Sequence, residues 1–321
     1  MPAARSNVVF SGAMSTPADT SHATRGMLLV ALGATLWSTT GVVSRILFEQ
    51  TDVSPLTVAF IRFVIASPLF MILGLIYQGR DFIKLPAGNR RWLIALGLAQ
   101  TGFQVGYLAS VKLIGAGLAT LVTLCLAPIL VALLAAMLLR EPLTRRVLTA
   151  MAIAITGTAL LVISPQALQI GPGLWRGIGL ALMAAAFYAA FTLIGRHAAG
   201  RVHPMQSAAF GFGVGAVIML PLALWSGLTP VLDSAAIAVP ALLYISLIPT
   251  TLGYVLFFNG LRHTTATVSS ILVLLEPLGA ALLAWVVLNE ALGTYGLVGA
   301  IMLTGSVALL TLPRAHRQPG R

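Results

Sequence analysis

Charged residues are scarce in this chain of 321 residues. Lysine, arginine, aspartate and glutamate make up 8% of it, whereas hydrophobic residues make up 58%. A soluble domain carries about 25% charged residues, so the composition excludes a water-soluble globular protein. Apolar runs of about 18 residues or more, long enough to cross a bilayer, recur along the chain. The sequence therefore predicts an all-α polytopic membrane protein.

Groups that support catalysis are also missing from the apolar runs. The single cysteine, Cys125, excludes a disulfide within the chain and is interpreted as a small buried hydrophobe. All five histidines fall outside the predicted spans or at their edges: His22, His197, His203, His263 and His316. A membrane enzyme or metal site needs acids, bases or ligands clustered at depth. We therefore expect no enzyme activity, no metal and no cofactor.

Ten apolar segments have the length of a membrane-spanning helix, about 18 to 24 residues for a core about 30 Å thick. We place them at 27–48, 55–78, 92–111, 116–139, 145–163, 174–195, 204–226, 236–258, 266–288 and 295–312. Residues 1–26 are rich in Ser, Thr and Ala, and their apolar patch at Val8–Phe10 is too short for a signal peptide. We interpret residues 1–26 as a disordered cytoplasmic tail and residues 313–321 as a second cytoplasmic tail.

An internal repeat relates Leu275–Glu290 to Leu126–Glu141. At a constant offset of 149, eight of the sixteen positions are identical. The spans therefore form two five-helix units, 27–163 and 173–312, joined by a linker at 164–172. Because five is odd, the second unit enters the membrane from the opposite side, and the repeats are inverted. Inverted repeats are typical of alternating-access transporters with a central site between the halves.

The basic residues indicate which side of the membrane each loop faces. With the N-terminus inside, fifteen of the nineteen lie in cytoplasmic segments: Arg5, Arg25, Arg80, Lys84, Arg90, Arg91, Arg140, Arg145, Arg146, Arg196, Arg201, Arg262, Arg314, Arg317 and Arg321. Only Arg45, Lys112 and Arg176 fall on the other side. This bias predicts that both termini are cytoplasmic. It also explains the net charge of +11 by contact with anionic lipid, without a nucleic-acid partner.

Three sequence features together resemble a known family. They are the paired Pro…Glu blocks of the two repeats, the Ser-Pro-Leu-(x)5-Arg-Phe run of Ser54–Phe63, and Leu36–Ser38 in the first span. In their order and spacing, from about Met27 to Thr311, they are similar to EamA-type members of the drug/metabolite transporter superfamily. The resemblance implies a ten-helix exporter of small metabolites, commonly amino acids, in a bacterial inner membrane. Arg45, near the outer end of the first span, departs from the expected pattern.

Two ionisable residues, Arg62 and Glu276, lie deep within predicted spans. Glu276 is also where the repeats differ, since the first has Ala127 there. Arg62 is roughly 10 Å from the outer surface and Glu276 roughly 15 Å from the inner one, so in a core about 30 Å thick their depths differ by about 5 Å. The depths predict an ion pair. Whether that pair locks two helices or Glu276 faces a transport pathway is left open by the sequence.

Polar and aromatic groups share helix faces near these charges. Gln100, Gln104 and Tyr107 lie at i, i+4 and i+7, on one stripe of a helix. Close helix packing is the alternative explanation for the small polar residues. The predicted pathway residues are Glu276, Arg62, Gln100, Gln104, Tyr107, Trp37, Thr40, Tyr188, Tyr254 and Ser269. Helix breaks or hinges are predicted at Pro128, Pro249 and Pro277, because proline removes a backbone hydrogen bond.

These observations predict a secondary carrier that exports small amphipathic metabolites, with amino acids, including aromatic or hydrophobic ones, as the expected class. A proton or another ion would be the coupling partner. The alternative is a passive facilitator or gated channel. The sequence does not identify the substrate, the direction of transport or the oligomeric state.

The orientation can be tested with reporter fusions. Fusions after Lys84 and after Arg314 are expected to give cytoplasmic signals, and a fusion after Asp233 an external one, because the basic loops stay inside. A cytoplasmic signal at Asp233 would contradict both the orientation and the inverted repeat.

Overall fold

The computed structural model describes residues 17–84, 87–162, 173–288 and 293–312. This part of the chain is almost entirely helical and contains no β-strand. In chain order the elements are α1 (Pro17–Gln50), α2 (Pro55–Gln78), the 3-10 turn η1 (Gly79–Ile83), α3 (Ala87–Leu134), the π-helical turn η2 (Ala135–Leu139), α4 (Arg145–Val162), α5 (Leu174–Ala198), α6 (Pro204–Ser226), α7 (Thr229–Asp233), α8 (Ala235–Ile245), the π-helical turn η4 (Ser246–Leu252), α9 (Gly253–Leu261), α10 (Ala266–Leu272), α11 (Leu275–Leu288) and α12 (Thr294–Thr311).

The described helices confirm a polytopic membrane protein. Nine of them are long and apolar enough to cross a membrane, and one of the nine, Gly88–Leu139, has 52 residues. Gly115 interrupts the helical backbone of this segment with φ 77° and ψ 159°, a conformation that only glycine adopts readily. It divides α3 into two halves that each match a predicted span, so ten spans result. Their boundaries lie within a few residues of the predicted ones, except at the N-terminus.

The first helix begins earlier than predicted. Helix α1 starts at Pro17, so the predicted disordered tail is wrong for residues 17–26. Proline is favoured at the first helical position, where its missing N–H needs no partner, and the Ser/Thr content of this stretch obscured that signal. Residues 1–16, the predicted linker 164–172, Glu290 and the tail 313–321 lie outside the described residues.

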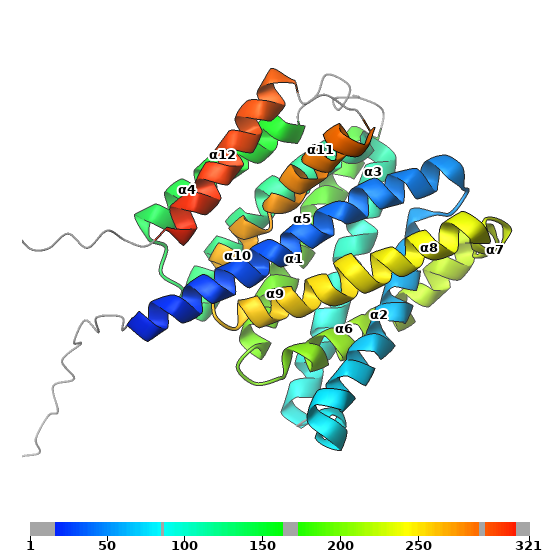
Figure 1. Cartoon of the computed structure of the whole chain (residues 1–321), viewed down its shortest axis with the longest axis horizontal. Coiled ribbons are helices and arrows are strands. Elements are labelled where there is room, and N and C mark those ends of the chain that lie inside the picture. The colour runs from blue at the N-terminus through cyan, green and yellow to red at the C-terminus, as the bar shows by residue number, and fades with distance from the viewer. Residues whose placement is uncertain (1–16, 85–86, 163–172, 289–292, 313–321) are drawn as a thin grey trace, which may run out of the picture.

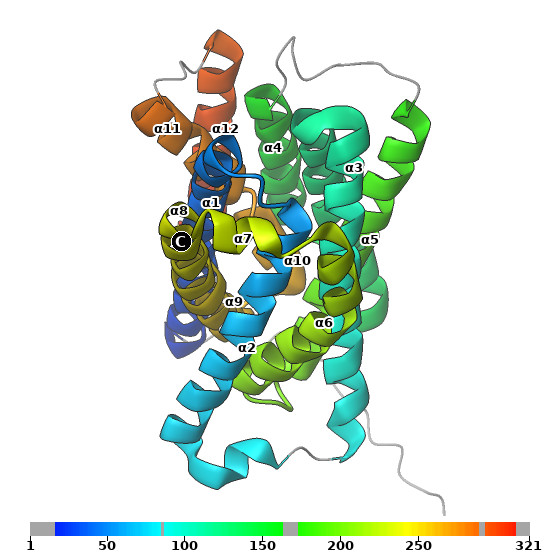
Figure 2. The ribbon, with the colours of Figure 1, turned by 90° about the vertical axis from the view of Figure 1, so that its right-hand side faces the viewer.

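Helix packing follows the repeat. Equivalent helices of the two units pack against each other, α2 against α6 and α4 against α12. The other main contacts correspond between the units. Helix α5, the first of the second unit, packs along α3 of the first unit, and α1, the first of the first unit, packs along α9 and α11 of the second unit. Figure 1 shows the α4–α12 pair at one side and α1 alongside α8 and α9. In Figure 2, α10 lies between the α1–α9 pair and the α3–α5 pair. Two inverted five-helix units account for this arrangement.

Corresponding sequence signals start α2 and α6. Ser54 caps α2 by accepting a hydrogen bond from Thr57 N, and Pro55 follows it. His203 and Pro204 occupy the same positions in α6, where Gln206 completes a capping box. An N-terminal cap with proline in the first turn is a strong helix start. The dipeptides Ser54-Pro55 and His203-Pro204 therefore mark equivalent helix starts in the two units.

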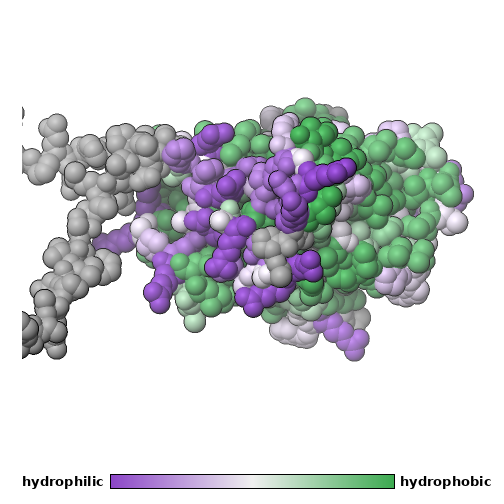
Figure 3. Space-filling view, turned by 90° about the horizontal axis from the view of Figure 1, so that it is seen from below, coloured by the Kyte–Doolittle hydropathy of each residue, from purple (hydrophilic) through white to green (hydrophobic). Residues whose placement is uncertain are grey.

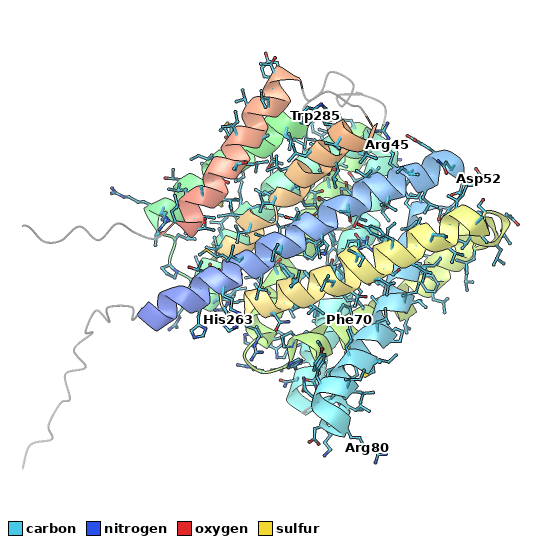
Figure 4. All side chains as sticks on the ribbon, viewed as in Figure 1. Arg45, Asp52, Phe70, Arg80, His263 and Trp285 are labelled. Carbon is cyan, nitrogen blue, oxygen red and sulfur yellow. The ribbon has the colours of Figure 1, made fainter. Side chains whose placement is uncertain are left out.

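Polar groups lie at the two ends of the bundle. Arg80 and His263 are towards one end in Figure 4, and Arg45 and Asp52 are at the other end of α1. Seen from below, hydrophilic side chains gather towards the end where α1 begins, and hydrophobic ones cover the other part of this face (Figure 3). This distribution fits a protein whose helix ends contact water and whose flanks contact lipid.

Glu141 joins the two repeats at one end of the bundle. Its carboxylate accepts hydrogen bonds from Ala266 N (2.8 Å), Thr267 N (3.1 Å) and Thr267 Oγ1 (3.0 Å). These atoms belong to the first turn of α10, whose backbone N–H groups have no partner within the helix. The guanidinium of Arg196 lies 3.8 Å away. A carboxylate at a helix N-terminus is favourable, so Glu141 has a structural role.

Removing this carboxylate is expected to destabilise the fold. Glu141→Ala should reduce the free energy of unfolding by about 2–3 kcal/mol, because hydrogen bonds to a buried charged acceptor are lost and backbone N–H groups are left bare. Glu141→Gln should reduce the free energy of unfolding by less, since the amide oxygen can still accept hydrogen bonds from α10. The measurement is thermal unfolding of the purified protein in detergent.

Glu49→Ala is the matched control. Glu49 pairs with Arg45 at 2.9 Å, but both side chains are about half exposed, and such surface pairs contribute about 0–1 kcal/mol. Equal unfolding temperatures for Glu141→Ala and Glu49→Ala would refute the structural role of Glu141.

Candidate functional site

Arg62 and Glu276 both lie within spans, but they do not form the predicted ion pair. Arg62 projects from α2, and its Nε donates a hydrogen bond to Thr250 Oγ1 in η4 at 3.0 Å. No nitrogen of Arg62 approaches an oxygen of Glu276 within 4.0 Å in the described structure. Both side chains are half-buried. Glu276 lies within electrostatic range of Arg62, but the ion pair predicted from their depths is absent from the described structure.

Glu276 lies beside a break in its span. Helix α10 ends at Leu272, and α11 begins at Leu275. The turn between them is closed by Leu274 N donating to Ile271 O at 3.1 Å and Glu276 N donating to Val273 O at 2.9 Å. Glu276 therefore lies in the first turn of α11, where a negative charge is favoured by the helix dipole.

The predicted proline breaks have three different outcomes. Pro277 lies in the first turn of α11, where its missing N–H is not needed, so the break precedes it. Pro249 lies within the π-helical turn η4, where Thr251 Oγ1 donates to Ser246 O at 2.7 Å. Helix α3 continues through Pro128 without a break and changes to π-helix only at Ala135. The helix break predicted at Pro128 is therefore not present.

A hydrogen bond between Gln100 and Tyr254 connects the two repeats near these charges. Gln100 Nε2 donates to Tyr254 Oη at 2.7 Å, and both side chains are buried. The Tyr254 ring packs against Trp37 and Phe212, at centroid distances of 4.6 and 4.7 Å. Residues from α1, α3, α6 and α9 thus meet in one aromatic cluster. Three of its residues, Trp37, Gln100 and Tyr254, are among the predicted pathway residues.

Tyr107 and Tyr188 form a second group beside the first. The hydroxyls of Tyr107 and Thr120 are 2.6 Å apart and join the two halves of α3. Phe103 packs against both tyrosines, at 6.0 Å from Tyr107 and 5.4 Å from Tyr188. Glu276 lies within electrostatic range of Tyr107, Tyr188, Tyr254 and Arg62, so it is near groups from both repeats.

Several polar atoms at this depth have no partner among the described residues. Trp37 Nε1, Thr101 Oγ1, Tyr188 Oη and Ser269 Oγ are buried and make no hydrogen bond within this part of the chain. A buried polar group without a partner costs free energy, so such atoms mark places where a ligand or water would be stabilised. Thr40 is half-buried and Gln104 buried.

The structure brings most predicted pathway residues together, but not all. Tyr254 contacts both Gln100 and Trp37, and Phe103 contacts both Tyr107 and Tyr188, whereas Arg62 and Glu276 approach Tyr254 only to within electrostatic range. Thr40, Gln104 and Ser269 make no side-chain hydrogen bond or ring contact with this group in the described structure. Thr120 and Phe212 were missed, and nothing in the sequence singles them out. Thr250 could have been found, because it lies four residues before Tyr254 on the same helix face.

Two grooves on the surface contain none of these residues. One lies between α2 and α6 and is lined by Ser67, Met71 and Phe210 among others. The other lies between α11 and α12. Both are almost entirely apolar, as expected of a lipid-facing surface. No group of three or more His, Cys, Asp or Glu capable of holding a metal is found among the described residues.

Comparison with known proteins agrees with this architecture. A transporter from Archaeoglobus fulgidus, named "Uncharacterized transporter", is 26% identical over 88% of this chain and 96% of its own length. The "Uncharacterized transporter YwfM" of Bacillus subtilis is 28% identical over 90% of this chain and 95% of its own length. The "Uncharacterized inner membrane transporter YicL" of Salmonella typhimurium is 27% identical over 91% of this chain and 97% of its own length. A solved crystal structure superposes with a TM-score of 0.75, at 20% identity, covering 92% of this chain and 97% of its own, which shows the shared fold.

The family assignment follows from the sequence match together with the fold. Residues 24–163 and 175–312 each match the same family, and these ranges correspond to the two inverted units. The chain belongs to the EamA-like transporter family and is a membrane transporter.

Proposed function

We propose that this protein is a secondary transporter that exports small amphipathic metabolites, with amino acids, aromatic and hydrophobic ones among them, as the substrate class. Transport would proceed by alternating access, with the substrate bound between the repeats. One observation carries this proposal: Arg62 and Glu276 lie within spans, unpaired with each other, among polar and aromatic groups from both repeats. Charges at this depth are expensive and are retained in proteins for a function.

Support for the site comes from its backbone. The span that carries Glu276 is broken at Val273–Leu274, and the span that contacts Arg62 is π-helical at η4. Irregular backbone at membrane depth is tolerated only against protein or a water-filled cavity, and discontinuous helices form the substrate sites of many carriers. These features favour a central site over the apolar grooves on the lipid-facing surface.

The proposed location is a bacterial inner membrane with both termini in the cytoplasm. The distribution of basic residues supports this orientation, and the Salmonella relative is named an inner membrane transporter. A proton or another ion is the proposed coupling partner, because Glu276 is a carboxylate within a span, and such carboxylates mark ion and proton pathways.

Counterflow in proteoliposomes tests the carrier proposal. Vesicles preloaded with each of the twenty amino acids should take up the same labelled amino acid faster than empty vesicles. The reason is that a carrier reorients across the membrane faster with bound substrate than without it. A passive channel, the alternative, gives no such trans-stimulation. Uptake without trans-stimulation for every permeant amino acid would favour the channel.

Glu276→Gln should strongly reduce transport while leaving membrane expression near normal. The substitution keeps the size and hydrogen-bonding capacity of the side chain but removes its charge. We expect at least a tenfold lower counterflow rate, and a flatter dependence of that rate on pH. Glu49→Gln, at an exposed position, is the matched control and should transport normally. Wild-type rates for Glu276→Gln across pH would mean that the carboxylate has no role in transport.

A further inference from the structure

The two charges within the spans come from different repeats and break the symmetry between them. Arg62 belongs to the first unit, and the equivalent position in the second, 149 residues on, is Gly211. Glu276 belongs to the second unit, and its equivalent is Ala127. Each repeat thus supplies one charge where the other has a small apolar residue. The two charges have opposite signs and lie within spans of different repeats.

The structure leaves most of the binding capacity of both groups unused. A guanidinium has five N–H donors, and in the described structure Arg62 uses only Nε, in its bond to Thr250. A carboxylate offers about four acceptor sites, and the Glu276 side chain accepts no hydrogen bond from any described residue. Two long side chains of opposite charge would gain energy by pairing. Their separation leaves each charge available to an external partner.

The surroundings favour a partner that combines charges with an apolar part. Trp37, Phe212 and Tyr254 form an aromatic cluster, and Phe103 lies between Tyr107 and Tyr188. The hydrogen-bond donors Trp37 Nε1 and Tyr188 Oη are buried and unpartnered in the described structure. A simple cation would satisfy only Glu276, and a simple anion only Arg62. A zwitterion with an apolar side chain satisfies both and contacts the rings.

We propose that Arg62 binds the carboxylate and Glu276 binds the ammonium group of the same zwitterionic substrate, so that one molecule bridges the two repeats. This inference rests on the proposed transport function and adds the role of each charge. Arginine suits a carboxylate because its planar donors bind both oxygens. The bound zwitterion replaces the missing ion pair, and the closed site then contains no net charge.

Three compounds with one ring but different charges test the proposal. L-phenylalanine has both charges, phenethylamine lacks the carboxylate, and 3-phenylpropionate lacks the ammonium group. Each is used to compete against labelled L-phenylalanine counterflow in wild-type proteoliposomes. L-leucine, isopentylamine and 4-methylpentanoate form a second series with an aliphatic side chain. The zwitterion should compete at least tenfold better than either analogue, which corresponds to about 1.4 kcal/mol for each lost charge contact.

The variants assign each charge to one end of the substrate. In Arg62→Gln the competitive advantage of each amino acid over its amine analogue, phenethylamine or isopentylamine, should fall severalfold. Its advantage over the carboxylate analogue, 3-phenylpropionate or 4-methylpentanoate, should remain. Glu276→Gln should show the reverse pattern. Arg80→Gln and Glu49→Gln change exposed residues of the same types and should leave both ratios unchanged. Thermal stabilisation of the purified proteins by the same six compounds provides a second readout that does not require transport.

The outcomes separate this inference from the proposed function. If no amino acid shows counterflow or stabilisation, both proposals fail. If amino acids exchange but zwitterion and analogues compete equally well in the wild type, bridging is refuted and the carrier stands. If both variants bind the amino acid, the amine and the carboxylate analogue more weakly by the same factor, bridging is also refuted. If a variant does not fold, the wild-type competition series still decides.

Discussion

The hydrocarbon interior of a membrane offers a helix no hydrogen-bond partner, and this constraint shapes the whole molecule. Unbroken helices satisfy their own backbone, so ten spans form most of the described structure. Where a span begins or is interrupted, side chains or altered turns supply the missing partners. Glu141 binds the first N–H groups of α10, Thr265 caps the same helix, and Thr251 bonds across the π-turn η4. The irregular segments are therefore stabilised by specific contacts.

The same interruptions position the candidate site. Helix α11 restarts inside the membrane and carries Glu276 in its first turn, whereas the equivalent region of α3 continues as helix through Pro128. The π-turn η4 brings Thr250 within 3.0 Å of Arg62. The two repeated units thus differ in backbone structure at the candidate site. A duplicated scaffold provides the symmetric interface, each unit adds one charge, and the irregular segments next to both charges belong to the second unit.

Contacts between the units also indicate where movement would meet resistance. At one end, Glu141 holds α10 and lies near Arg196. At the other, Thr57 Oγ1 donates to Gly227 O at 3.0 Å and so ties α2 to α6. Alternating access requires one repeat to move relative to the other around a fixed site. The polar contact made by Glu141 therefore stabilises the conformation in this structure, and its loss would favour another.

The sequence by itself determined the membrane class, the ten spans and the inverted repeat, because hydrophobic length, basic loops and a constant offset are local or periodic signals. It also identified most residues of the candidate site, since a charge or a polar stripe within an apolar run is conspicuous. Only the tertiary structure decided which of them meet. The separation of Arg62 from Glu276, the contact with Thr250 and the break at Val273–Leu274 instead of at Pro277 depend on how helices rotate and pack against neighbours far away in the chain. Depth along a helix can be counted from the sequence, but the direction in which a side chain points is set by its partners.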